Sequence, residues 1–132
     1  MSVPMVRDLQ ALATERGPGA YLVTVSVQGG PHTVYTTVHW DGGTFVAEAG
    51  ATTAANAAAR PSVSLLFPVR NDGDYSLIVD GLAVVEPGEG GARLRLRPTK
   101  AVLHRQGPSP DPASSCGADC VPLPLLAMPV RR

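Results

Sequence analysis

Residues 20–48, AYLVTVSVQGGPHTVYTTVHWDGGTFVAE, decide the fold of this 132-residue chain. Its first part alternates Tyr, Val, Val and Val with Leu, Thr and Ser, a period of two that is typical of a β-strand. Its second part is dense in Thr, Val and Tyr, which suit a pleated surface. A third part follows at residues 44–48. Two glycine pairs, Gly29-Gly30 and Gly42-Gly43, separate the three parts, and glycine adopts turn conformations without steric cost. The stretch therefore predicts strands at 20–27, 32–40 and 44–48, joined by turns at 28–31 and 41–43.

The segments on either side of this stretch predict two helices and three more strands. Apolar residues at three- and four-residue steps from Val3 to Ala13 predict a short helix that ends at Gly17-Pro18. The alanine-rich residues 51–60 before Pro61 predict a second helix. Three more strands are predicted at 62–67, 75–86 and about 94–103, with a bulge or corner at Gly81.

Six strands joined mainly by short turns favour antiparallel pairing, most simply a meander. Closing them into a barrel avoids bare sheet edges. We therefore predict a mainly β fold, a six-stranded antiparallel barrel with short flanking helices, formed by residues 1–105.

Residues 106–132 form a proline-rich C-terminal tail with six prolines. Proline lacks the backbone donor that a helix interior or a central strand needs, so this tail is expected to be either flexible or an extended arm. Its apolar part, residues 121–128, favours docking on a partner subunit or on the barrel.

Composition excludes several classes of protein. Eleven Lys and Arg residues balance eleven Asp and Glu residues, which argues against nucleic acid and against a polybasic membrane surface as partners. No run of 18 apolar residues and no signal-peptide pattern occurs, so we expect a cytoplasmic protein without membrane association.

The cysteines and histidines do not form a recognisable metal site. Cys116 and Cys120 form a C-x3-C pair that lacks further ligands, leaving a redox pair, an adventitious disulfide or two unpaired thiols open. His32, His39 and His104 lie on different predicted strands without paired ligand spacing.

Several segments together resemble the split-barrel flavoprotein superfamily typified by pyridoxamine 5′-phosphate oxidase, including its deazaflavin-dependent reductases. The resemblance extends from Ala20 to about His104. It rests on these segments: Gly30-Pro31-His32, Trp40-Asp41-Gly42-Gly43-Thr44-Phe45, Asn56 followed by Arg60-Pro61-Ser62-Val63-Ser64-Leu65-Leu66, and Leu96-Arg97-Pro98-Thr99-Lys100-Ala101-Val102-Leu103. It implies a six-stranded split β-barrel that forms a homodimer and holds a flavin at the subunit interface.

The resemblance also implies a set of cofactor-binding residues. FMN is the expected cofactor, with the deazaflavin coenzyme F-420 or no cofactor as alternatives. The residues implied are Tyr35, Thr36, Thr37, Thr52, Thr53, Asn56 and Arg60. Family members commonly carry Lys and Arg where this chain has Thr53 and Ala51, and simple N-capping is the alternative role of Thr52 and Thr53.

The function expected from this resemblance is an FMN- or deazaflavin-dependent oxidoreductase that acts on a small organic substrate. The cofactor supplies the chemistry in such enzymes, and no catalytic residue stands out in this sequence. The alternative is a non-catalytic split-barrel dimer, a ligand-binding, sensor or haem-binding protein that has lost the phosphate-gripping basic residues.

Overall fold

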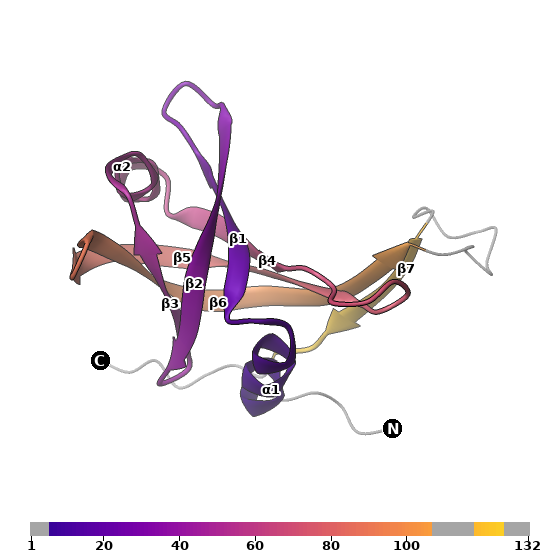
Figure 1. Cartoon of the computed structure of the whole chain (residues 1–132). Coiled ribbons are helices and arrows are strands. Elements are labelled where there is room, and N and C mark those ends of the chain that lie inside the picture. Colours follow the sequence, from indigo (N-terminus) through magenta and orange to yellow (C-terminus); the bar gives the residue numbers. More distant parts are fainter. Residues whose placement is uncertain (1–5, 107–117, 126–132) are drawn as a thin grey trace.

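The computed structural model describes residues 6–106 and 118–125 of the chain and is built mainly from β-strands (Figure 1). The elements are, in chain order, α1 (Val6–Arg16), β1 (Gly19–Val25), β2 (Pro31–Asp41), β3 (Thr44–Ala49), α2 (Ala51–Ala59), β4 (Ser62–Phe67), β5 (Ser76–Gly88), β6 (Gly91–Gln106) and β7 (Ala118–Leu123). Both predicted helices and all six predicted strands are present. The predicted helical residues before Val6 lie outside the described part.

The strands are hydrogen-bonded in the order β3-β2-β1-β4-β5-β6-β7, and β3 also pairs with β6. All pairings are antiparallel, and the β3–β6 pairing closes the predicted six-stranded barrel. The topology differs from one continuous meander, because β4 pairs with β1 rather than with β3. Helix α2 stands between β3 and β4 in the chain, so no tight turn forces these two strands together. The chain therefore forms two three-stranded meanders that meet at both edges.

The barrel interior is filled by apolar side chains on alternate positions of each strand. Phe45 lies between Trp40 and Phe67, with ring centroids 4.9 Å and 5.5 Å away. Leu65, Leu77, Val79 and Leu94 are also among the most buried side chains. This interior is a packed core.

Gly81 marks the predicted irregularity in β5. The pairing of β5 with β6 shifts between Asp80 and Gly81. A Cβ atom at Gly81 would lie 2.4 Å from the backbone oxygen of Arg97, which is closer than two such atoms approach. Only glycine allows β5 to pass β6 this closely.

Part of the proline-rich tail forms β7, which pairs with the end of β6 (Figure 1). Leu123 is buried in the core cluster, so this part of the tail is an extended arm docked on the barrel. Cys120 is exposed on β7 opposite His104, whereas Cys116 lies outside the described residues. Neither helix of the described ranges is long and apolar enough to cross a membrane.

Candidate functional site

Helix α2 begins without a side-chain cap. Its N-cap residue is Gly50, and the first helical hydrogen bond joins the Ala54 amide to the Gly50 oxygen at 2.9 Å. The amides of residues 51–53 precede this bond and carry the partial positive charge of a helix amino end. Thr52 is exposed there, whereas Thr53 is 2% exposed. The end of α2 thus presents backbone donors and the Thr52 side chain to solvent, and neither threonine caps the helix.

Asn56 fixes α2 on the barrel. Its side-chain nitrogen donates a hydrogen bond of 3.1 Å to the Thr24 hydroxyl, and both residues are buried. A buried amide requires such a partner, so this bond selects how α2 lies over β1. Asn56 acts here as a positioning residue for the helix.

The three predicted residues on β2 lie on two faces of the strand. The Thr36 hydroxyl donates to the backbone oxygen of Glu48 at 2.9 Å, which places Thr36 beside the end of β3, two residues before Gly50. Tyr35 and Thr37 point to the opposite face because successive strand residues alternate. Thr36 is therefore the one of the three that approaches the amino end of α2.

Tyr35 lies on the outer face of the barrel. Its ring packs edge-on against Tyr21 with centroids 5.0 Å apart, and it covers Gly19, where a Cβ atom would lie 1.9 Å from the Tyr35 hydroxyl. The residue is nevertheless 62% exposed. Tyr35 begins a row of outward-facing, mainly apolar residues that are direct strand partners across β2, β1, β4, β5 and β6: Tyr35, Tyr21, Leu66, Ile78 and Val102. We call this set the outer row.

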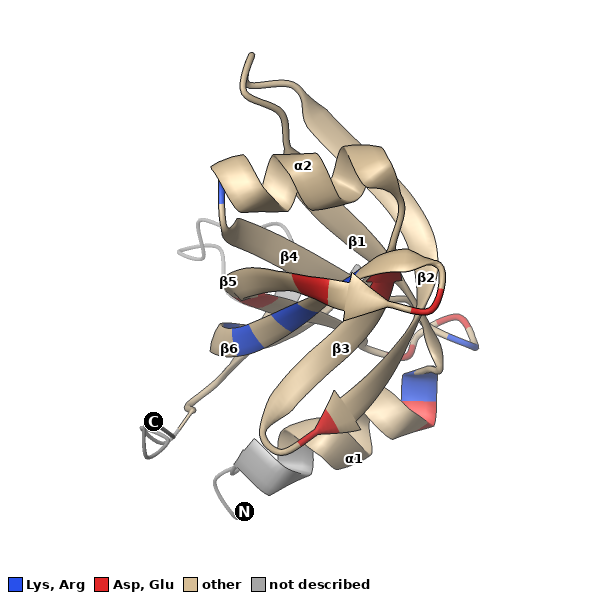
Figure 2. Cartoon of the chain, turned by 90° about the vertical axis from the view of Figure 1, so that its left-hand side faces the viewer, with Lys and Arg blue, Asp and Glu red and all other residues tan. Residues whose placement is uncertain are grey.

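Arg60 lies at the other end of α2 from Thr52. It follows the nine-residue helix, whose length is about 13 Å at 1.5 Å per residue. Its guanidinium donates to the backbone oxygen of Val27 at 3.1 Å. Figure 2 shows α2 uncharged along its length, with a basic residue only past its end. Within one chain, the structure brings Thr36, Thr52 and Thr53 toward one end of α2 and leaves Arg60 at the other.

An ion-pair cluster on the outside of the barrel was not predicted. Arg95 donates to Glu86 at 2.9 Å and 3.1 Å and to Asp41 at 2.9 Å, and Arg93 donates to Glu86 at 2.8 Å. Hydrogen bonds from Arg95 lower the pKa of Asp41 and of Glu86 below their usual values. The pKa of Arg95 is raised in turn, mainly by its hydrogen bonds with Glu86.

Arg93 and Arg95 do not lie at a free sheet edge. Strand β6 pairs with β3 on one side and with β5 on the other where these two arginines stand. Their acidic partners, Asp41 and Glu86, come from β2 and β5. Arg97 remains exposed.

No family model matches the chain. An uncharacterized protein of Mycobacterium bovis and one of Mycobacterium tuberculosis are each 37% identical to it over 131 residues, a match that covers 86% of this chain and 92% of either relative. These two proteins and this chain are thus members of one family.

Solved structures share the fold. A putative pyridoxamine 5′-phosphate oxidase from Listeria innocua superposes with a TM-score of 0.63 at 19% identity, covering 74% of this chain and 96% of that one. An F-420 reductase gives 0.58 at 20% identity, covering 70% and 94%. A haem-binding protein from Mycobacterium smegmatis gives 0.61 at 14% identity, covering 92% and 60%. The same barrel is therefore shared by proteins with different ligands.

Proposed function

Because the chain shares its fold with pyridoxamine 5′-phosphate oxidase-like split-barrel proteins, we propose that it is a homodimeric flavoprotein, an oxidoreductase that binds FMN or, alternatively, the deazaflavin coenzyme F-420. The observation that carries this proposal is the uncapped amino end of α2 beside Thr36. Backbone amides at a helix amino end bind phosphate well. A bound flavin would supply the hydride chemistry, and this chain's residues would hold and orient it.

The donors at this end of α2 suit a phosphate, but they are neutral. The first turn holds Ala51, Thr52 and Thr53, so its contribution consists of amides, the helix dipole and hydroxyls. A missing charge-assisted contact removes about 1.5–3 kcal/mol of binding free energy. We expect FMN to bind roughly ten- to a hundredfold more weakly than in a relative with the basic residue, unless a basic residue of a second subunit reaches the site.

The outer row supports dimerisation. It places Tyr35 and Tyr21 side by side on the outer surface of the sheet, where Tyr35 is 62% exposed and Tyr21 is 40% exposed. Tyrosine-rich, apolar surfaces of this kind are typical of interfaces. We expect Tyr35→Glu to give a folded monomer in sedimentation velocity, because a buried unpaired carboxylate is costly. A Tyr35→Glu protein that stays dimeric would place the interface elsewhere.

The flavin proposal is tested by titrating the purified protein with FMN and, separately, with coenzyme F-420, following absorbance. Thr52→Lys adds an exposed cation beside the proposed phosphate position, and Ala59→Lys adds the same charge at the far end of α2. We expect Thr52→Lys to bind FMN about tenfold more tightly and Ala59→Lys to match the wild type. Thr53→Lys should also tighten binding, provided the lysine stem extends from under the helix to solvent. Equal affinities for all variants would refute the phosphate placement.

A second candidate function is haem or other ligand binding without flavin chemistry. It is favoured by His39, which lines an apolar cavity of about 260 Å³ together with Trp40 and Phe67. Titration with hemin would then give a Soret band that His39→Ala abolishes and His104→Ala leaves intact. An FMN-binding protein that gives no such band with hemin would exclude this candidate.

A further inference from the structure

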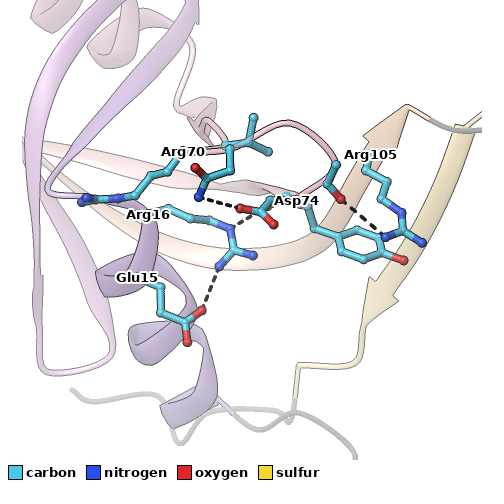
Figure 3. Close-up of a pocket in the computed structure, with 9 residues that line it drawn as sticks. Glu15, Arg16, Arg70, Asp74 and Arg105 are labelled. Atoms are coloured by element: carbon cyan, nitrogen blue, oxygen red, sulfur yellow. Dashed lines mark hydrogen bonds and ion pairs between the residues drawn. The ribbon is translucent and has the colours of Figure 1, made fainter.

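A cavity of about 400 Å³ lies at the carboxyl end of α1 (Figure 3). It is bordered by α1, by the loop that joins β4 to β5, and by the end of β6. Three arginines reach it, one from each of these segments: Arg16, Arg70 and Arg105. We call this cavity the arginine pocket.

The arginine pocket is separate from the site at α2. Strand β4 starts at Ser62, just after α2, and ends at Phe67. The loop that follows β4 lines the pocket from Val69 onward. Six strand residues span about 20 Å. Figure 1 shows α2 and the loop between β4 and β5 at opposite ends of these strands.

Arg16 is held rigidly in the wall of this pocket. Its side chain is only 13% exposed, and it donates to the backbone oxygens of Tyr75 and Leu12 at 2.8 Å each. It also pairs with Glu15 at 3.3 Å. Within the described part of the chain, its Nη2 has no acceptor. A fixed guanidinium with a spare donor loses little entropy when it binds an oxyanion.

Arg105 provides a second cation across the pocket. Its guanidinium stacks over the Tyr75 ring at 4.4 Å from the centroid and donates to the Gly73 oxygen at 3.5 Å. Arg70 donates to the Gly17 oxygen and so ties the β4–β5 loop to the chain after α1. These contacts fix the pocket wall from three sides.

The Arg16 guanidinium is the part of the pocket that best suits an anion. Figure 3 shows the Arg70 side chain turned away from the other labelled groups, so Arg16 and Arg105 share the pocket with the two carboxylates of Glu15 and Asp74. Glu15 pairs with Arg16, whereas Asp74 accepts a hydrogen bond of 3.4 Å from the Asn71 side chain. The Glu15 side chain is 70% exposed, so its ion pair with Arg16 is weak and an incoming oxyanion can replace it. The pocket volume lies within the range of small-molecule sites, roughly 300–1,000 Å³, and exceeds what an inorganic ion fills.

We propose that the arginine pocket binds a small organic molecule through a carboxylate or phosphate group. The oxyanion contacts Arg16 and Arg105, and the rest of the molecule occupies the space beside Tyr75. This site is independent of flavin binding at α2, so it survives if the proposed function fails.

The test uses ¹⁵N-labelled full-length protein, titrated with citrate and, separately, with glycerol 3-phosphate at constant ionic strength. We expect shifts of the Gly73, Asp74 and Tyr75 amide signals, while the Thr52 amide is unchanged. Glu15→Gln should tighten binding roughly two- to fivefold, because it removes the competing carboxylate. Glu89→Gln, an exposed acid on the β5–β6 turn, is the matched control. Arg16→Gln should weaken binding about tenfold.

A response to citrate alone identifies a carboxylate ligand, and a response to glycerol 3-phosphate alone identifies a phosphate ligand. The absence of shifts with both probes overturns the proposal. Binding that Glu15→Gln leaves unchanged, or that Glu89→Gln improves equally, also overturns it. The Glu15→Gln result stands even where Arg16→Gln does not fold, because Glu15 is exposed and contributes little to the core.

Discussion

Replacing Gly81 by alanine tests whether the close approach of β5 and β6 is what this barrel needs at its register shift. Gly81 pairs with Val63 on β4 and with Pro98 on β6. An added Cβ atom would lie 2.4 Å from the Arg97 oxygen and 2.5 Å from the Leu96 Cδ2 atom. Carbon and oxygen atoms in sheets stay about 3.3–3.6 Å apart, so the strands must separate by about 1 Å.

The loss of folding stability depends on which atoms have to move to make room for the Cβ atom. The nearest atom is a backbone oxygen in a strand paired on both sides, so we expect the upper part of the overpacking range, about 3 kcal/mol. Alanine also lowers the conformational entropy of the unfolded chain, which offsets about 0.4–1 kcal/mol of this loss in stability. For 132 residues the unfolding entropy converts 1 kcal/mol into about 4 °C of Tm. The net loss of about 2 kcal/mol thus lowers the Tm by about 8 °C.

Differential scanning calorimetry of Gly81→Ala and of Gly90→Ala checks this reasoning. A Cβ atom at Gly90, on the turn between β5 and β6, would meet no atom within 4 Å. We therefore expect Gly90→Ala to stay within about 3 °C of the wild type. Equal Tm values for Gly81→Ala and the wild type, or an equal loss at Gly90, would show that the approach of β5 to β6 is not limiting.

Three further predictions concern other parts of the fold. Asn56→Leu should cost about 1–3 kcal/mol in urea unfolding, because it leaves the buried Thr24 hydroxyl without its donor. Arg95→Met should flatten the acid limb of a stability-versus-pH curve. The two carboxylates that Arg95 contacts have lowered pKa values when folded, so they bind more protons when unfolded. Their contribution is present above the usual carboxyl pKa, about 4, and is lost as pH falls through the lowered values. Leu123→Ala should cost about 2–3 kcal/mol by calorimetry, because Leu123 is 6% exposed in the core.

Each of these has a control. For Asn56→Leu, the double variant with Thr24→Val should recover part of the loss, since both buried polar groups are then removed. For Arg95→Met, Arg97→Met changes an exposed arginine on the same strand and should leave the acid limb unchanged. For Leu123→Ala, deletion of residues 106–132 should lower stability while a cooperative transition of the six-stranded barrel remains. A cooperative transition lost on deletion would mean that β7 is required for folding.

The sequence predicted the elements of this fold because local signals were strong and agreed with one another. Glycine pairs at 29–30 and 42–43 define both early hairpins, and alternating side chains define the strands. Gly81 was interpretable as an irregularity because a glycine inside a strand has no packing benefit of its own. The split-barrel resemblance used the order of these same segments.

The candidate site was only partly predictable. The sequence placed Thr52 and Thr53 at the start of α2, but which of them is exposed depends on how the helix lies on the barrel. That orientation is set by the bond from Asn56 to Thr24, which joins residues 32 positions apart. Whether these residues bind a cofactor stays a prediction.

The sequence by itself determined the strands, the helices and the alternation of their faces, because these depend on neighbours within a few residues. Only the tertiary structure decided that β4 joins β1, that β3 meets β6, and that β7 returns from the tail to the sheet. It also gathered Arg16, Arg70 and Arg105 around one cavity. Such contacts join residues up to 89 positions apart, and they form because burying apolar faces and pairing strand edges favour one closed arrangement over the alternatives that local patterns allow.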